Sequence, residues 1–409
     1  MDKKRLKRYA ELTVKVGANV QKGQGVIINA SVDQEEFVAL ITEEAYRVGA
    51  KWVEVQWSSQ NVTRLHQNYQ TLEQLSKMPH WQEEKHKMMA EELPAMIHIL
   101  SDDPDGLNGV DQEKMQKSNA ARRKIVKKYR DAMENRHQWT IVAAPSKAWA
   151  KKVFPGLTCA KAKDQLWEAI LQTVRVDKSN DPIEAWAEHN RNFQEKCKIL
   201  TEYDFDRLHY TSSNGTDFTV WLIPHARWIG GGETALNGVY YNPNMPTEEI
   251  FTSPMKGKAE GKLVSTKPLS YQGQLIEDFS ITFEAGKAVE WEARKGEDVL
   301  GHMIQTDEGS AYLGELALVP YDSPISNAGI LFYETLFDEN ASCHVALGRG
   351  FSMALDGFEA MTWEEATNKG INDSLIHVDF MIGSGDLSVD GYTREGKKVT
   401  VFHNGNWAL

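Results

Sequence analysis

The feature that most constrains the fold is an alternation of short apolar runs with longer helical stretches through the first 176 residues. The run GQGVIINA at residues 23–30 is typical of a strand, and residues 34–49 carry apolar side chains at helical spacing. A second strand, KWVEVQW, follows at residues 51–57. Strand, helix and strand in this order form a βαβ unit, so the two strands are expected to be parallel.

The alternation continues with further strands and helices. Apolar runs at residues 95–101 and 139–146 are expected to be strands; helical stretches are expected at residues 61–92, 118–136 and 160–176. This pattern predicts a doubly wound α/β domain built on a parallel sheet.

The chain changes character after a polar helical stretch at residues 177–198. From Ile199 it is rich in strands punctuated by glycine and proline, and residues 206–224 are typical of a hairpin that turns at Asn214-Gly215. We therefore expect an amino-terminal α/β domain at residues 1–198 and a strand-rich α+β domain at residues 199–409.

Composition excludes several classes of partner. The formal net charge of −12 argues against a general binder of nucleic acid or of anionic membranes. Apolar runs are only strand-sized, and the basic amino terminus lacks the apolar core of a signal peptide. Three widely separated cysteines, Cys159, Cys197 and Cys343, fit neither a disulfide framework nor a CxxC zinc site. A reducing, cytoplasmic setting is expected.

A nucleotide site is the first proposal that a doubly wound sheet invites. Gly23 and Gly25 are the available glycines, but they precede the strand, whereas the dinucleotide fingerprint follows a strand and opens a helix. A tight turn into the strand explains them better.

The most informative polar pattern lies in the apolar run at residues 376–383, IHVDFMIG. Side chains two apart on a strand share a face, so His377 and Asp379 lie together while Val378 and Phe380 take the other side. An imidazole and a carboxylate are costly to bury without a partner. A divalent cation would satisfy them, and so would a simple His–Asp hydrogen bond in a core.

Other acids and a histidine occur in similar surroundings. Glu315 is isolated in an apolar strand, where it either meets a cation or points to solvent from an edge. Glu248 and Glu249 lie in a loop bracketed by prolines, and Asp338 and Glu339 precede His344. A thiol dyad of Cys343 with His344 is a poor proposal, because neighbours on a strand face opposite ways. Carboxylates and imidazoles together suit a pair of cations such as Zn²⁺, Co²⁺ or Mn²⁺, which need a bridging carboxylate and activate a water molecule.

Four motifs in order resemble those of the aminopeptidase T-type metallopeptidases, the family that includes aminopeptidase S and aminopeptidase PepS. They are NMPTEEIFTSP at 244–254, DEGSAYLGELALVP at 307–320, LFDENASCHVALG at 336–348 and HVDFMIG at 377–383. VQKGQGVIINA and WIGGGETALNG extend the resemblance over nearly the full length. It implies an exopeptidase with an α/β amino-terminal domain, a distinct carboxy-terminal catalytic domain and a homodimeric assembly.

The resemblance also implies a set of site residues. These residues are expected to hold two divalent cations (Zn, Co, Mn or Mg), and we expect Glu315 to bridge the two. The residues are Glu249, Glu315, Glu339, His344, His377 and Asp379. The family has a tyrosine shortly after the ALG of the histidine motif, where this chain has Phe351. Phenylalanine can neither donate to an oxyanion nor contact a metal, which puts the role of that one position in doubt.

The expected function is a cytoplasmic metallo-aminopeptidase that acts on short peptides. Glu315 and Glu248 are the expected catalytic carboxylates, Glu248 or a free oxygen of a ligand moving the proton to the leaving amine. Two alternatives remain open. The same ligands could serve a dinuclear hydrolase of phosphoesters or other amides, or the chain could bind peptides without turnover.

Overall fold

The computed structural model describes residues 2–271 and 274–409. The chain packs into two compact units. Unit 1 comprises residues 1–189, 232–246 and 331–334, and unit 2 comprises residues 190–231, 247–330 and 335–409. This division and the expected boundary near residue 198 both fall within the long helix α9, Pro182–Tyr203.

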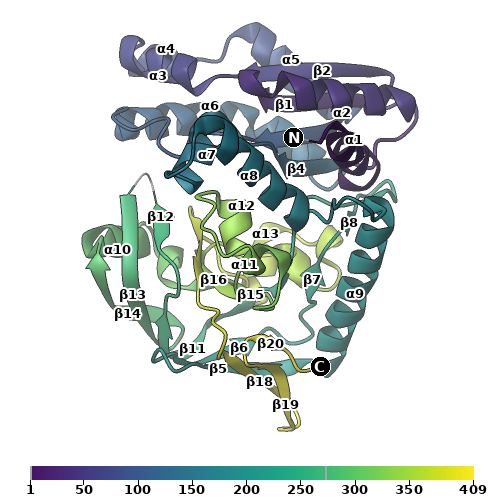
Figure 1. The fold of residues 1–409 in the computed structure, drawn as a ribbon. Helices are drawn as coiled ribbons and strands as arrows, with labels where there is room; N and C mark the ends of the chain where they lie inside the picture. Colours follow the sequence, from purple (N-terminus) through teal and green to yellow (C-terminus); the bar gives the residue numbers. More distant parts are fainter. Residues whose placement is uncertain (1, 272–273) are drawn as a thin grey trace. The chain divides into compact units, whose positions relative to one another are not determined.

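Unit 1 is built on the parallel sheet that the sequence predicts. Its four strands are β1 (Gly25–Ser31), β2 (Trp52–Ser58), β3 (Ala95–Leu100) and β4 (Trp139–Ala143), in the order β2-β1-β3-β4. All three strand pairs are parallel, and helices lie on both faces of the sheet (Figure 1). The expected α/β class of the amino-terminal part is therefore confirmed.

The remaining elements of unit 1 connect and cover these strands. They are α1 (Lys3–Leu12), a π-helical turn (Thr13–Gly17), a 3₁₀ turn (Val32–Gln34), α2 (Glu35–Arg47), α3 (Gln60–Tyr69), α4 (Leu72–Ser76), α5 (His80–Glu92), α6 (Gln112–Met133), α7 (Lys147–Val153), α8 (Cys159–Thr173), β8 (Glu233–Thr234) and β9 (Tyr240–Tyr241). The short helix α7 was not expected from the sequence. The glycine at position 23 makes the expected turn, with a φ of +81° that a side chain would strain.

The parallel sheet of unit 1 packs against apolar side chains of its helices. Ile27 of β1 packs with Met89 of α5 and Met133 of α6. Tyr9 of α1 stacks on Phe37 of α2 with ring centroids 4.9 Å apart, and Phe37 meets the edge of Trp167 of α8 at 5.7 Å. The helices of unit 1 are thus fixed by the apolar stripes that their sequences present.

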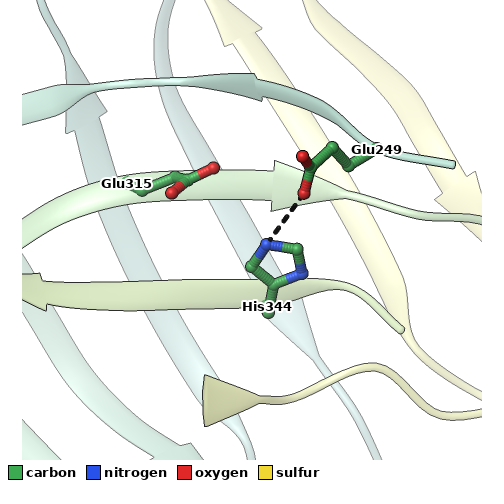
Figure 2. Close-up of side chains that lie close together, drawn as sticks. All are labelled: Glu249, Glu315 and His344. Atoms are coloured by element: carbon green, nitrogen blue, oxygen red, sulfur yellow. Dashed lines mark ion pairs between the residues drawn. The ribbon is translucent and has the colours of Figure 1, made fainter. Parts of the chain in front are cut away.

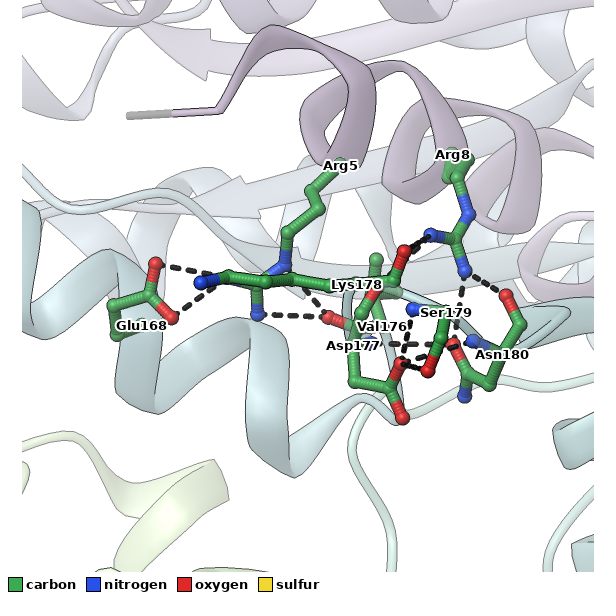
Figure 3. A network of polar contacts seen from close by, with 8 residues as sticks. All are labelled: Arg5, Arg8, Glu168, Val176, Asp177, Lys178, Ser179 and Asn180. Carbon is green, nitrogen blue, oxygen red and sulfur yellow. Dashed lines mark hydrogen bonds and ion pairs between the residues drawn. The ribbon is translucent and has the colours of Figure 1, made fainter.

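A polar network ties helix α1 to the segment that follows α8 (Figure 3). The buried guanidinium of Arg5 donates to both carboxylate oxygens of Glu168, at 2.8 and 2.6 Å, and to the Val176 carbonyl at 3.1 and 2.9 Å. Arg8 donates to the Asn180 side-chain oxygen at 2.9 Å and to the Asp177 carbonyl at 2.9 Å. Because Arg5 supplies every donor of its cluster, the cluster depends on one residue.

We predict that Arg5→Met lowers the free energy of unfolding of unit 1 by about 2–3 kcal/mol, because it leaves a buried carbonyl and a carboxylate without their donors. Denaturant unfolding of the full chain measures the loss. Arg47→Met is the matched control. The exposed Arg47 pairs with Glu43 and, at 3.6 Å, with Glu44, which keeps Lys15 as a partner, so its loss should cost no more than about 0.5 kcal/mol. Equal losses in the two variants would contradict the prediction.

Unit 2 is rich in strands, as expected. Its larger, nine-stranded sheet has the order β12-β13-β11-β6-β5-β18-β19-β20, and β14 pairs with β13. These strands are β5 (Phe205–Thr211), β6 (Asp217–Leu222), β11 (Pro254–Val264), β12 (Leu269–Tyr271), β13 (Gln274–Glu284), β14 (Lys287–Lys295), β18 (Ser388–Thr393), β19 (Lys398–His403) and β20 (Asn406–Trp407). Strands β5 and β6 are antiparallel neighbours, which confirms the predicted hairpin.

A second, five-stranded antiparallel sheet of unit 2 has the order β17-β16-β15-β10-β7. Its strands are β7 (Ile229–Gly230), β10 (Ile250–Thr252), β15 (Leu313–Leu318), β16 (His344–Gly348) and β17 (His377–Met381). Besides the carboxy-terminal part of α9, unit 2 has the helices α10 (Glu297–Ile304), α11 (Pro324–Asn327), α12 (Thr335–Glu339) and α13 (Trp363–Asn368). In the described part of the chain, no helix combines the length and the apolar character needed to cross a bilayer.

One apolar core joins the two sheets of unit 2. Phe279 of the larger sheet meets Phe380 of β17 with ring centroids 5.5 Å apart. Leu316, Val345 and Leu347 of the five-stranded sheet are fully buried in the same cluster. Since these side chains all point to one face, the alternate residues of β15, β16 and β17 face the other way, and that second face carries the polar groups.

Candidate metal centre

Every expected ligand on strands β15, β16 and β17 lies on the face that points away from the apolar core. Asp379 of β17 is opposite Ala346 of β16, and Ala346 is opposite Glu315 of β15. In the next row His344 is opposite Ala317. Directly paired residues of antiparallel strands share a face, so polar side chains alternate here with alanines. The small residues leave room above the sheet between the polar groups.

Three side chains from separate segments meet on this face (Figure 2). Glu249, which directly precedes β10, places its Oε2 3.2 Å from Nε2 of His344 on β16. Glu315 of β15 lies beside this pair, and one ligand atom of each of the three residues falls within 4.8 Å of the others. Residues far apart in the sequence therefore form one compact donor group.

A second donor group shares one member with the first. Nε2 of His377 lies 3.0 Å from Oε2 of Glu315 and 3.4 Å from Oδ1 of Asp379. One ligand atom from each of these three residues again falls within 4.8 Å of the others. Glu315 thus belongs to both groups. The alternative that Glu315 points to solvent from an edge is wrong, because β15 lies inside the sheet and Glu315 is 5% exposed.

Both imidazoles are oriented by backbone carbonyls. Nδ1 of His344 lies 3.0 Å from the Ser342 carbonyl oxygen, and Nδ1 of His377 lies 2.7 Å from the Arg349 carbonyl oxygen. A carbonyl can only accept, so Nδ1 carries the proton in each ring and Nε2 is directed at the carboxylates. This second hydrogen bond is the arrangement that fixes a metal-binding histidine.

Several ionisable groups of the site have raised pKa values, whereas, despite burial, pairing with His377 lowers the pKa of Asp379. Burial raises the pKa of Glu315 to about 7, although His377 opposes the effect. Burial alone would lower the pKa of His377, but its pairing with Asp379 and Glu315 raises it to about 11. Burial, with the charges of Asp379 and Glu249, also raises the pKa of Glu339. Burial and the neighbouring carboxylates therefore disfavour a further uncompensated negative charge at this site.

The donor set fits divalent cations on these observations. Carboxylate oxygens and imidazole nitrogens are ligands that Zn²⁺, Co²⁺ and Mn²⁺ accept. Cys343, next to His344 in the sequence, is not part of the donor set, because its thiol hydrogen-bonds the backbone of Val319 on the core side. Oδ1 of Asp379 is buried and makes no hydrogen bond, and its contact with Nε2 of His377 is an ion pair at 3.4 Å. An acceptor left in that state is costly unless a cation meets it.

Two expected residues lie outside both groups. Glu339, at the end of α12, is close enough for the charges of Asp379 and Glu249 to act on it, but it is in neither group. Glu248 is buried, and its backbone N–H donates to Oδ1 of Asn340 at 2.8 Å. Asn340 was not anticipated from the sequence. An asparagine that fixes a loop backbone gives no pattern that a single sequence can reveal.

Phe351 packs directly against the site. Its ring lies 4.9 Å from that of His377 and 5.3 Å from that of Phe251, centroid to centroid. Its backbone N–H donates to Ser253 Oγ at 2.8 Å. The ring therefore occupies a defined place beside His377, although it carries no hydroxyl group.

Gly314 allows the close approach that holds His377 in place. A Cβ atom built at Gly314 would lie 2.4 Å from the carbonyl oxygens of Gly348 and Arg349. The Arg349 carbonyl is the acceptor for Nδ1 of His377. A side chain at position 314 would push this carbonyl away from the imidazole.

We predict that Gly314→Ala destabilises unit 2 by about 1–3 kcal/mol, the usual cost of overpacking a site whose neighbours are backbone atoms. Denaturant unfolding measures the loss. Gly156→Ala is the control, because nothing lies within 4 Å of a Cβ atom built at Gly156. The free energy of unfolding of this variant should differ from that of the wild type by less than about 0.5 kcal/mol. A Gly314→Ala protein as stable as the control would show that the carbonyl has room to move.

Comparison with known proteins identifies the family. The family model described as thermophilic metalloprotease (M29) matches residues 2–407. The chain belongs to the M29 family of metalloproteases. Its membership confirms the resemblance of the four motifs and makes it a metal-dependent peptidase.

The relatives are similar over their whole lengths. Aminopeptidase AmpS of Bacillus subtilis (strain 168) is 45% identical over 99% of this chain and 98% of its own. Aminopeptidase T of Thermus thermophilus is 40% identical over 100% of this chain and 99% of its own. The solved structure of wild-type AmpT from Thermus thermophilus matches with a TM-score of 0.92, covering all of both chains at 39% identity. This match confirms the expected fold class in both parts of the chain.

Proposed function

We propose that this metalloprotease is a dinuclear aminopeptidase that removes amino-terminal residues from short peptides. The observation that carries the proposal is that Glu315 belongs to two donor groups at once. A carboxylate shared in this way is what a bridged pair of cations requires. The named relatives, which are aminopeptidases, support the choice of substrate.

The proposed ligands extend beyond the two groups. Glu249, Glu315 and His344 would serve one position, and Glu315, His377 and Asp379 the other, with Glu339 completing the set. Divalent cations held there, among Zn, Co, Mn and Mg, would supply the Lewis acidity that activates water and stabilises the developing oxyanion.

The other tasks fall to the chain itself. His344 and His377 are held in one tautomer by the carbonyls of Ser342 and Arg349, so neither ring needs to reorient during the reaction. Glu248, buried next to Glu249, or an unliganded oxygen of one of the ligand carboxylates would move the proton to the leaving amine.

We further propose that the protein acts in the cytoplasm as a homodimer. Its three free cysteines are consistent with a reducing compartment. Sedimentation of the purified protein at several concentrations tests the dimer.

We predict that Glu315→Gln reduces both metal occupancy and turnover, because the amide cannot replace a bridging carboxylate. The wild type should bind about two equivalents of Co²⁺ or Zn²⁺ and cleave an aminoacyl chromogenic amide. The variant should lose most of that metal and at least a hundredfold in rate, the usual scale for losing a metal-site interaction.

Glu290→Gln is the matched control, since Glu290 is exposed on β14, and it should change neither quantity. Full metal occupancy in Glu315→Gln would remove the shared ligand from the proposal. A wild type loaded with metal that cleaves no aminoacyl amide would overturn the aminopeptidase assignment itself.

Peptide binding without turnover is the second candidate, and Phe351 favours it because the ring beside His377 lacks a hydroxyl group. We predict that the metal-loaded wild type nevertheless shows turnover, with Phe351→Tyr altering its rate by less than the loss of Glu315 does. Calorimetric binding of a dipeptide with no product after prolonged incubation would favour the second candidate. Hydrolysis of a phosphodiester in preference to the amide would instead indicate a different substrate.

A further inference from the structure

An aromatic pair borders the donor groups. Phe251 and Phe351 meet edge to face, with ring centroids 5.3 Å apart and planes inclined at 62°. Phe351 in turn lies 4.9 Å from the ring of His377. Two aromatic rings and an imidazole of the site thus form one continuous surface.

Strand geometry places Phe251 on the site face of the sheet. Phe251 is opposite Ala317, and Ala317 is opposite His344. Phe251 is also two residues after Glu249, so the two side chains of this extended segment share a side. Phe251 therefore stands among the polar groups instead of in the apolar core with Ile250.

The exposure of these rings distinguishes them from the apolar side chains of the core. The large apolar side chains on the opposite face, including Leu316, Val345 and Phe380, are completely buried. Phe251 and Phe351 are only half-buried. His377, which Phe351 contacts, is the most exposed member of its donor group, with 27% of its side chain accessible. The accessible margin of the site is therefore apolar on this side.

We propose that Phe251 and Phe351 form the subsite that receives the side chain of the first residue of a substrate, and that this residue is apolar or aromatic. The inference rests on the proposed aminopeptidase function. In a peptide with its first carbonyl at the donor groups, the first side chain branches from the carbon between that carbonyl and the amine. On the side of the site that these rings border, the first side chain would lie against them, and half-buried phenylalanine rings recognise apolar groups.

The test is the ratio of kcat/KM for a phenylalanyl amide to that for an alanyl amide. The metal-loaded wild type should prefer the phenylalanyl amide by about tenfold or more, the discrimination that an apolar subsite gives. Phe251→Ala should lower this ratio by about tenfold. Phe251→Trp, which fills the subsite instead of emptying it, should also lower the ratio and guards against a fold defect in the first variant.

Phe358→Ala is the matched control. Phe358 is half-buried too, but it packs against a separate apolar cluster that contains Leu355 and Ile371. The ratio should stay within about twofold of wild type in this variant. Metal content measured in all variants should equal that of the wild type, because neither Phe251 nor Phe358 belongs to a donor group.

Binding of phenylalaninamide and alaninamide, measured by calorimetry on the metal-loaded protein, separates the two levels of the proposal. No turnover of any amide, with a phenylalaninamide preference that Phe251→Ala removes, would overturn the proposed function and support the subsite. Turnover with a wild-type preference for charged first residues would overturn the subsite and leave the function intact. Unchanged ratios in both Phe251 variants would overturn the subsite as well.

Discussion

The five-stranded sheet of unit 2 carries a cluster of ionisable side chains on one of its faces. Beside an apolar core, such a cluster is tolerated only if positive charge balances its carboxylates. Glu249, Glu315 and Asp379 face His344 and His377 within hydrogen-bonding or ion-pair distance, on a sheet whose other face is fully apolar. Desolvation disfavours charge in such a place and raises the pKa of Glu315, while pairing with Asp379 and Glu315 raises the pKa of His377 despite its burial. Divalent cations of the kind that a metalloprotease binds would meet the same electrostatic demand.

The period of the β-strand makes that demand compatible with stability. Strand β16 contributes Val345 and Leu347 to the core and His344 and Ala346 to the site, so one strand serves both faces. A shift of one residue would exchange the two sets, which ties the register of the sheet to the burial of its core. The geometry of the donor groups is therefore maintained by the same packing energy that holds the two sheets of unit 2 together.

The sequence was sufficient for the features that depend on local periodicity. Apolar runs and helical spacing predicted the parallel sheet of unit 1, and alternation predicted that His377 and Asp379 share a face. It was not sufficient for features that depend on contacts between distant segments. The position of β15 inside its sheet decides the environment of Glu315, and the Arg349 carbonyl beside Gly314 orients His377. Neither fact has a local pattern, because each arises only when remote strands pair.

Phe351 contributes to the orientation of His377 but cannot donate a hydrogen bond. Its ring packs on His377 while the segment that carries it supplies the Arg349 carbonyl to the same imidazole, so this segment orients His377 from two directions. A phenylalanine ring can provide that packing as well as the ring of a tyrosine, whereas it cannot donate a hydrogen bond. The phenylalanine therefore supplies only one of the two contributions that a tyrosine at this position would combine. Orientation of the imidazole is retained, and any chemistry of a phenol must be supplied elsewhere or be absent.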